Sequence, residues 1–439
     1  MEEELTRQRE TRQQRIETLK NKYSTALLHQ PSESLSSKRS ERCLSITEAE
    51  AAVLYNPKRP RYLSADDDMF AESNSENSMV PNQTLDKNIE DVDDASGYYI
   101  FRAGEEMAGK YKVQGQKGRG VFSNVAFATV GDTSTVVALK VLRNNETMRR
   151  AGNKEELLLQ EIRQCLVPSF VVDFLESFEH HQHLVLVFEA MHMNLRQILY
   201  RYGRNIGINI LGVQRYGQQL FKGLDCLEKL NIVHADLKLD NILVSQDLQT
   251  VKLCDFGCAF RLDDHTREST AYLVSRFYRA PEIILGLSKE NIGCAIDTWA
   301  LGTCLFELFA GTVLFPGRSN NEMIKFIMRS KGKVPNRILK KHCDSYINVF
   351  RKEPHFEPKS FAFREILYDE QGQPGVKVHQ VVSDAKHNLS SKLERRQSNS
   401  LDDTRLVPHL AKLLESTLAI DPSHRISVKD ALASPFFSE

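Results

Sequence analysis

The sequence lacks several features that would mark particular classes of protein. Its eight cysteines form no Cys-x-x-Cys pair and no paired metal-ligand spacing, which is typical of reduced thiols in an intracellular protein and argues against zinc. It has no excess charge of either sign, with 58 basic and 58 acidic residues, so no whole-protein field would attract nucleic acid. The first ten residues, MEEELTRQRE, lack the apolar core of a signal peptide.

A long, uncharged apolar run is also missing. The most apolar long stretch, 296–315, contains Asp297, Glu307 and several glycines, so we predict a buried helix there and not a membrane span. We therefore expect a soluble protein. Its 439 residues, 41% of them apolar, suffice for two or three domains or for one large two-lobed domain with tails.

Residues 1–97 differ in composition from the rest of the chain. A charged run comes first, serines and prolines follow, and 64–97 contains ten acidic residues against the single Lys87. Such a segment buries too little apolar surface to offset its ordering entropy, so we predict a disordered charged tail. Within it, the basic cluster at 58–61 (KRPR) is of the nuclear-import type, with an ordinary solvated tail as the alternative.

From Tyr98 onward the pattern becomes that of a globular domain. Alternating apolar residues predict strands, and apolar residues spaced by three and four predict helices after Met191. Strands followed by helices indicate an α+β protein with a small antiparallel-sheet lobe and a larger helical lobe. The predicted strands are 111–116, 121–130, 135–142 and 183–190, and the clearest predicted helix is 212–230.

These patterns place one domain at 98–439. Its sheet lobe should span about 111–190 and its helical lobe about 191–437. The interval 331–405 is polar and contains proline, glycine and a serine-rich stretch, so we expect an insertion with limited structure of its own.

A glycine-rich segment follows the first predicted strand. Gly118, Gly120, Ser123 and Val125 fit the pattern G-x-G-x-x-G-x-V, except that Ser123 replaces the third glycine. Glycine lets a strand–turn–strand segment approach nucleotide phosphates closely; a plain hairpin turn is the alternative. A dinucleotide-binding motif is excluded because a strand and not a helix follows, and no Gly-Lys-Ser/Thr completes a Walker P-loop.

Lys140 ends the run Val-Ala-Leu-Lys inside an otherwise apolar strand. A buried lysine is costly unless an opposite charge accompanies it. In the protein kinase pattern such a lysine contacts the α- and β-phosphates of ATP and a glutamate on the next helix. We choose Glu155 as that glutamate, because three apolar residues of the helix then form one packing stripe; Glu156 is the alternative.

The stretch VHADLKLDN at 233–241 contains most of the catalytic-loop pattern H-R-D-L-x-x-x-N. Asp236 and Asn241 stand where the pattern requires them, but Ala235 replaces the arginine. Asp-Phe-Gly at 255–257 and Ala-Pro-Glu at 280–282 follow in order. The complete ordered set is not expected by chance.

The chemistry of phosphoryl transfer explains these residue types, because the reaction depends mainly on positioning and charge neutralisation. Asp236 can accept or orient the proton of a substrate hydroxyl, and Lys238 can neutralise charge on the transferred phosphate. Asn241 and Asp255 offer the oxygen ligands that Mg²⁺ prefers. No essential charged catalytic residue is missing.

Further stretches make the resemblance specific. The sequence SRFYRAPE at 275–282 resembles the CMGC group of eukaryotic protein kinases, some of which, the DYRK-like and CLK-like kinases, also lack the catalytic-loop arginine. The chain is most similar to the pre-mRNA-processing factor 4 kinases, which associate with the spliceosome, and the resemblance implies a two-lobed protein kinase fold. The matching stretches include DASGYY, GRGVFSNV, LKVLRNNE, VFEAMHMNLRQIL, HADLKLDN, LCDFGCAF and AYLVSRFYRAPEIILG.

The resemblance also implies roles for residues outside these motifs. Phe188 would be the gatekeeper of the adenine site, with Glu189 and Met191 presenting hinge backbone groups to adenine. Asp297 would lie on a buried helix that anchors the catalytic loop. The other implied contacts are Val125 and Ala138 above adenine, Leu243 below it, Trp299 near Asp297, and a pair between Glu282 and Arg425.

Two departures concern the catalytic region. In kinases with a complete H-R-D the arginine binds a phosphate on the activation loop, which Ala235 cannot do. The activation segment contains Thr270 and Tyr272, followed by Arg276 and Arg279. We expect phosphorylated Tyr272 to dock on these arginines and order the substrate-binding loop, since paired arginines bind phosphate bidentately. An aromatic packing residue with surface arginines is the alternative.

The other departure is Leu239, which replaces the usual proline of D-L-K-P-x-N. We expect this substitution to alter loop stiffness and not the chemistry. The long Arg/Ser-rich N-terminal region of many family members is absent from this sequence, which bears on docking to the spliceosome more than on catalysis.

The leading interpretation is an active serine/threonine kinase that uses ATP and Mg²⁺. Its expected partners are protein substrates, among them splicing factors, with no direct nucleic-acid or membrane binding. We expect a monomeric kinase domain in the nucleus, with the cytoplasm as an additional location, and tyrosine autophosphorylation in the activation loop. The alternative is a pseudokinase scaffold that tethers nuclear partners, against which Lys140, Asp236, Asn241 and Asp255 argue.

Overall fold

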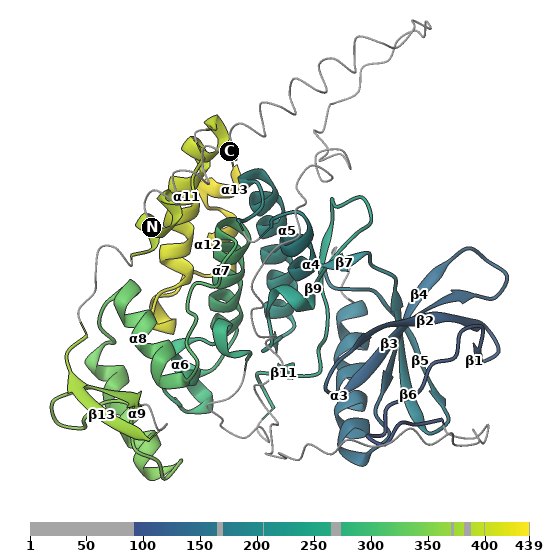
Figure 1. The fold of residues 1–439 in the computed structure, drawn as a ribbon, viewed down its shortest axis with the longest axis horizontal. Coiled ribbons are helices and arrows are strands. Elements are labelled where there is room, and N and C mark those ends of the chain that lie inside the picture. The colour runs from purple at the N-terminus through teal and green to yellow at the C-terminus, as the bar shows by residue number, and fades with distance from the viewer. Residues whose placement is uncertain are drawn as a thin grey trace, which may run out of the picture.

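The computed structural model describes residues 92–439 except 165–169, 205, 265–273, 370–372, 382–387, 399 and 439. Within these residues, an antiparallel sheet lobe precedes a helical lobe, which confirms the predicted two-lobed α+β fold (Figure 1). The predicted tail therefore lies outside the described residues up to position 91, and so does the basic cluster at 58–61.

Six antiparallel strands form the sheet, in the order β1-β2-β3-β4-β6-β5. Alternation of apolar residues places one face of the sheet in a small core of its own, which includes Val113, Ala128 and Val185. The strands are β1 (Glu106–Met107), β2 (Tyr111–Arg119), β3 (Ser123–Val130), β4 (Val136–Leu142), β5 (Phe174–His180) and β6 (His183–Glu189). All four predicted strands are therefore present, and β5 was missed because this edge strand is rich in polar residues.

Helix α3 (Glu146–Arg163) packs on the other face of the sheet (Figure 1). Asn145 caps it, since its side chain accepts a hydrogen bond from the backbone N–H of Met148 at 2.8 Å. The buried side of the helix includes Leu158, Leu159 and Ile162, which is the predicted packing stripe. The stripe sets the rotation of α3 and so directs its acidic residues.

The helical lobe is built around three long helices, α5 (Ile210–Lys229), α7 (Ala295–Ala310) and α11 (Leu401–Thr417). Every residue of α7 from Ile296 onward is buried, which confirms the predicted buried helix. Among the described residues no helix is long and apolar enough to cross a membrane.

The remaining elements of this lobe are short. The helices are α4 (Leu195–Arg201), α6 (Pro281–Ile284), α8 (Asn320–Lys331), α9 (Asn336–Asn348), α10 (Leu389–Glu394), α12 (Val428–Leu432) and α13 (Pro435–Ser438). The short strands of this lobe are β7 (Met193–Asn194), β8 (Ile232–Val233), β9 (Ile242–Val244), β10 (Val251–Leu253) and β11 (Phe260–Arg261).

Two expectations need correction. The interval 331–405 contains α9, α10 and a hairpin of β12 (Phe363–Tyr368) and β13 (Pro374–His379), so the expectation of limited structure was wrong. The polar average hid the amphipathic character of α9, which buries Ile338, Leu339 and Tyr346. The boundary at residue 97 was also too late, because Asp93 and Asp94 already contact the sheet lobe.

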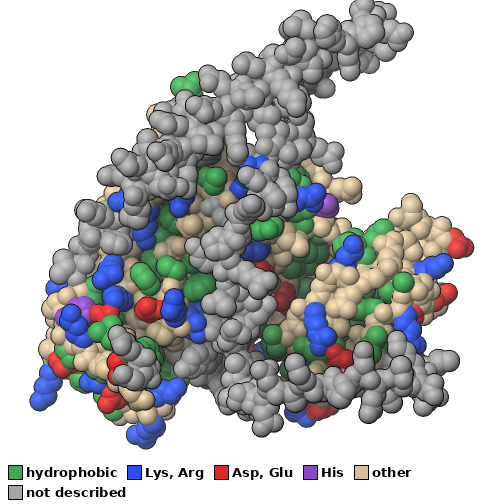
Figure 2. All heavy atoms as spheres, in the orientation of Figure 1, with side chains coloured by type: hydrophobic (Ala, Val, Ile, Leu, Met, Phe, Trp, Pro, Cys, Tyr) green, Lys and Arg blue, Asp and Glu red, His purple; other side chains and the backbone are tan. Residues whose placement is uncertain are grey.

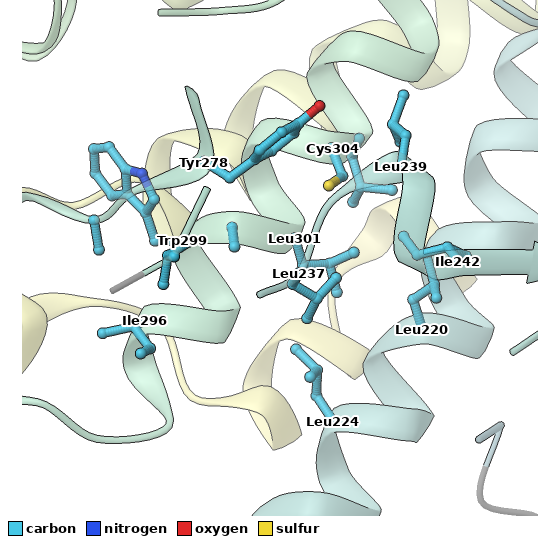
Figure 3. Packing of buried hydrophobic residues seen from close by; sticks show 14 of the residues in the cluster. Leu220, Leu224, Leu237, Leu239, Ile242, Tyr278, Ile296, Trp299, Leu301 and Cys304 are labelled. Atoms are coloured by element: carbon cyan, nitrogen blue, oxygen red, sulfur yellow. The ribbon is translucent and has the colours of Figure 1, made fainter. Parts of the chain in front are cut away.

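The structure shows where Leu239 packs, the residue that stands in place of the usual proline. The side chain is fully buried and belongs to the main core of the helical lobe. Figure 3 shows it in the same packed cluster as Ile242 and Cys304. Leu239 thus anchors the catalytic loop, of which it is part, in the core of the helical lobe.

Candidate active site

The predicted lysine joins the two lobes of the structure. Lys140 on β4 donates hydrogen bonds to Oε1 and Oε2 of Glu155 at 2.7 and 2.9 Å, and to Oδ1 of Asp255 at 2.9 Å. Glu155 also accepts the backbone N–H of Phe256 at 3.2 Å. One glutamate of α3 therefore binds both the strand lysine and the Asp-Phe-Gly segment.

The charges in this cluster depend on one another. Burial alone would lower the pKa of Lys140, but the carboxylates of Asp255 and Glu155 raise it above its usual value. The Lys140 charge lowers the pKa of Asp255 to about 2. Burial raises the pKa of Glu155, against the opposing effect of Lys140. An ammonium group beside an ionised Asp255 is suited to binding phosphates and a cation side by side.

Glu156, the alternative partner of Lys140, has different contacts. It accepts hydrogen bonds from Ser177 at 2.6 Å and from Gln160 at 3.0 Å. Helix geometry rotates consecutive residues by about 100°, so only one of the two glutamates can face the cleft. In the structure that residue is Glu155.

The proposed base, Asp236, is held by four donors. Its Oδ1 accepts the hydroxyl and the backbone N–H of Ser275, at 2.7 and 3.2 Å. Its Oδ2 accepts Nδ2 of Asn241 at 3.1 Å and lies 3.0 Å from Nζ of Lys238. Lys238 also donates to the Ser275 hydroxyl at 3.2 Å. Ser275 begins the segment 275–282, which we call the substrate-side loop. The Asp236 carboxylate, Lys238 and the start of this loop thus form one network.

Burial and charge act in opposite directions on Lys238. Desolvation lowers its pKa, but the Asp236 carboxylate and the hydrogen bond between them raise it above the ordinary lysine value. Lys238 is therefore cationic, as charge neutralisation during phosphoryl transfer requires.

The backbone of the catalytic loop is anchored by α7. Asp297 accepts the N–H of His234 at 2.7 Å and that of Ala235 at 3.0 Å. Ala235 is fully buried with φ of 62°, and Asp255 has φ of 65°. Two residues in this uncommon conformation flank the site, and such strain is frequent at functional positions.

Two oxygen donors fit a divalent cation. The amide nitrogen of Asn241 donates to the backbone carbonyl of Asp236 at 2.9 Å, which orients the amide and leaves Oδ1 as its acceptor atom. Asp255 is ionised, and its side chain is 40% exposed in the cleft. A carboxylate and an amide oxygen are ligands of the kind that Mg²⁺ uses in kinases.

The predicted nucleotide-contact residues lie on adjacent strands and the hinge. Gly118 pairs with Val125 across β2 and β3, and Val125 pairs with Lys140 across β3 and β4. Ala138 pairs with Phe188, which is 8% exposed beside the hinge. The register therefore aligns the glycine-rich strands with the lysine.

The other predicted contacts lie around the hinge and in the loop. Glu189 uses its side chain to accept from Lys252 at 2.5 Å and from the N–H of Asp173 at 2.8 Å. Leu243 is half-buried on β9 and Met191 is buried. Gly120 and Ser123 close the turn between β2 and β3, where the N–H of Gly120 donates to the Ser123 carbonyl at 2.8 Å.

The predicted regulatory residues are only partly described. Thr270 and Tyr272 lie outside the described residues. Arg276 is half-buried, and Arg279 is 2% exposed, with Nε and Nη2 donating to the carbonyl of Val274 at 3.1 and 2.8 Å. Arg279 is therefore not a surface arginine, and its docking to a phosphate on Tyr272 stays a prediction.

A buried ion pair lies at the end of the substrate-side loop, at Ala-Pro-Glu. Arg425 donates to Glu282 through Nη1 at 2.6 Å and Nη2 at 2.9 Å, and both side chains are fully buried. This contact was expected from the resemblance. It fixes the Ala-Pro-Glu segment to the end of the helical lobe.

Two polar residues near the catalytic loop, Ser275 and Arg196, were not among the predicted site residues. Ser275 was quoted only as part of a motif, although its spacing after Asp-Phe-Gly could have suggested a contact with Asp236. Arg196 had no signal of its own, yet it lies 3.2 Å from Asp240 and also binds Glu307 and the Tyr278 hydroxyl. These partners are distant in sequence, so only the fold brings them together.

Comparison of the sequence with known proteins identifies its family. Residues 111–437 match the model of the protein kinase domain, so the chain belongs to the protein kinases. It is a serine/threonine kinase, similar to the serine/threonine-protein kinase prp4 of Schizosaccharomyces pombe, with 36% identity over 85% of this chain and 78% of that protein. The serine/threonine-protein kinase prpf4B of Dictyostelium discoideum is 36% identical over 84% of this chain, which spans 47% of that relative.

A third relative is more distant. The dual specificity tyrosine-phosphorylation-regulated kinase 2 of Drosophila melanogaster is 34% identical over 61% of this chain and 36% of its own length. The chain is thus similar both to prp4-type kinases and to a dual specificity tyrosine-phosphorylation-regulated kinase, which supports the resemblance to the CMGC group. A protein kinase domain also implies the use of ATP and action on protein substrates.

Proposed function

We propose that the chain transfers the γ-phosphoryl group of ATP to serine or threonine residues of pre-mRNA-processing proteins in the nucleus. The observation that carries the catalytic part is the network of Asp236, Lys238 and Ser275 beside the Lys140–Glu155–Asp255 cluster. The splicing role rests on the resemblance to the pre-mRNA-processing factor 4 kinases.

Each residue has a defined part in the proposed transfer. Asp236 orients the substrate hydroxyl and accepts its proton, while the Ser275 and Asn241 donors hold the carboxylate in place. Lys238 neutralises charge on the transferred group, and Lys140 binds the phosphates of ATP. Asn241 and Asp255 would hold Mg²⁺, which when bound neutralises charge on the phosphate oxygens.

A direct test measures transfer of radiolabelled phosphate from ATP to a generic basic protein. We expect wild type to label it and Asp236→Asn to lower the rate by 10²- to 10⁴-fold, the usual contribution of a general base. Equal rates for the two folded proteins would contradict the proposed catalytic role of Asp236 and favour the alternative, a pseudokinase scaffold. Omitting Mg²⁺ from the assay tests the proposed cation in the same way.

The substrate class needs a separate experiment. Wild type and Asp236→Asn are added to nuclear extract, and newly phosphorylated peptides are identified by mass spectrometry. Enrichment of serine and threonine sites in splicing factors supports the proposal, and enrichment in unrelated proteins contradicts it. Replacing the basic residues of 58–61 with alanine and locating the tagged protein tests nuclear import.

Activation is proposed to depend on a phosphate on Tyr272. The buried Ala235 leaves no arginine in the catalytic loop, whereas Arg276 and Arg279 follow Tyr272 closely in sequence. Tyr272→Phe should lower activity and abolish tyrosine autophosphorylation. Unchanged activity of folded Tyr272→Phe would refute this mode of activation.

A further inference from the structure

The segment just before the matched kinase domain contacts the glycine-rich loop through Tyr98. The hydroxyl of Tyr98 lies 2.9 Å from the carbonyl oxygen of Gly120 and 2.8 Å from that of Val121, so its single proton is shared between them. These residues form the turn between β2 and β3. Tyr98 is 8% exposed, whereas Val121 is 50% exposed. A buried side chain thus holds the backbone of an exposed turn.

Two arginines lie close to the ring of Tyr98. The guanidinium of Arg119, at the end of β2, lies 3.9 Å from the ring centroid, and that of Arg143, just after β4, lies 4.6 Å from it. Stacking of this kind is attractive and orients the ring. Arg143 also donates to the Val121 carbonyl at 3.4 Å, which adds a second contact to the same turn.

The backbone around Tyr98 is fixed by its own hydrogen bonds. Asp94 accepts the N–H groups of Ser96 and Tyr98 at 2.8 and 3.0 Å, and it pairs with Arg119 at 2.8 Å. The carbonyl of Gly97 accepts the N–H of Asn144 at 2.9 Å. The segment is therefore attached to β2 and to the end of β4, and it presents Tyr98 to the turn in one orientation.

From this geometry we propose that Tyr98 is a positioning residue that holds the glycine-rich loop in the conformation that binds the phosphates of ATP. The inference rests on the proposed function, because it concerns the same nucleotide site. Glycine gives the loop the freedom to approach phosphates but also many unproductive conformations. A loop already held in the binding conformation loses less entropy when the nucleotide arrives, which raises affinity.

This assignment gives a role to residues outside the match at 111–437. DASGYY carries part of the family resemblance, yet neither the catalytic nor the cofactor assignments use it. Its first tyrosine, Tyr98, contacts the turn of the glycine-rich loop. Its second tyrosine, Tyr99, contacts other residues. Tyr99 donates to Glu105, and its hydroxyl lies 3.2 Å from Nε2 of His180.

The adjacent tyrosines supply a matched pair of variants. Tyr98→Phe keeps the ring beside the arginines and removes only the hydroxyl. Tyr99→Phe removes a hydroxyl of the same segment that contacts Glu105 and His180 and not the turn. The KM for ATP, the kcat and the affinity for a fluorescent ATP analogue are measured for both variants and for wild type, together with their thermal unfolding.

For Tyr98→Phe we expect the KM for ATP and the dissociation constant of the analogue to rise about two- to tenfold, the effect of one lost neutral hydrogen bond. The kcat at saturating ATP should stay within about twofold of wild type. Hydrogen exchange of the amides at 118–123 should become faster in the nucleotide-free protein. Tyr99→Phe should keep the wild-type KM for ATP even where it unfolds at a lower temperature.

A wild-type KM and analogue affinity in folded Tyr98→Phe would overturn the proposal, and so would equal increases in both variants. The second result would assign the tyrosines a shared role in stability. Analogue binding requires no phosphoryl transfer, so the two proposals fail separately. A wild-type chain that binds the analogue but transfers no phosphate refutes the proposed function and leaves the role of Tyr98 measurable.

Discussion

Ser275 donates its hydroxyl to Oδ1 of Asp236 across 2.7 Å, which joins the start of the substrate-side loop to the proposed catalytic base. The residue also receives a hydrogen bond from Lys238 at 3.2 Å. Ser275 therefore connects the segment before Ala-Pro-Glu to two of the residues that we propose perform the transfer. Disorder of this loop would remove a donor from the base.

The first prediction concerns this contact. Ser275→Ala should lower kcat by about tenfold, because a hydrogen bond to a charged group contributes about 1.5 kcal/mol or more. Ser275→Thr retains the hydroxyl and should recover most of the rate. Steady-state kinetics with a peptide substrate measures both. Equal loss in the two variants would indicate that side-chain volume, and not the hydroxyl, matters at this position.

The second prediction separates the two adjacent glutamates of α3. Glu155→Gln should reduce kcat/KM about tenfold or more, because the amide removes the negative charge and leaves Lys140 one acceptor oxygen in place of two. Glu156→Gln should stay within about twofold of wild type, since Glu156 bonds to Ser177 away from the cleft. A larger effect of the Glu156 variant would contradict the proposed pairing.

A third prediction concerns the buried pair of Glu282 and Arg425. Arg425→Met should lower the free energy of unfolding by about 3–5 kcal/mol, because it leaves the Glu282 carboxylate uncompensated in the interior. Urea unfolding measures this loss. The double variant Glu282→Leu/Arg425→Met should recover part of it. Full recovery is not expected, because Arg425 also donates to the carbonyls of Ala419 and Ala295.

The fourth prediction concerns acid stability. Burial lowers the pKa of His342 to about 4 and that of His355, aided by the charge of His342, to about 3. Below pH 6.5 the unfolded chain binds protons that the folded chain still excludes. The free energy of unfolding is therefore undiminished by these histidines above pH 6.5. It declines as the pH falls toward 4, by about 1.4 kcal/mol per pH unit for each histidine.

Urea unfolding at several pH values between 7 and 5 measures this decline. His342→Gln removes one of the two histidines with the most strongly lowered pKa, so its slope with pH should be clearly smaller than that of wild type. His342 accepts the N–H of His355 at 2.9 Å, so a general loss of stability is also expected. The slope, and not the absolute stability, is the diagnostic quantity. A flat wild-type curve would show that these histidines are not buried in the neutral form.

Much of the fold and the site could be predicted from local patterns. Alternation with a period of two located β2, β3, β4 and β6, and a period near 3.6 located α5, because each pattern reflects which side of the element is buried. The same logic selected Glu155 over Glu156. The edge strand β5 and the helix α9 were not predicted, because their polar residues obscured the periodicity of the apolar ones.

The sequence by itself determined the class of chemistry, because Lys140, Asp236, Asn241 and Asp255 stand in ordered motifs whose residue types match phosphoryl transfer. Only the tertiary structure decided which groups form hydrogen bonds with these residues and fix their positions. Ser275 against Asp236 and Tyr98 against the turn at Gly120 are contacts between residues more than twenty positions apart. Such contacts depend on how whole elements pack, and side-chain spacing along the chain does not record that packing.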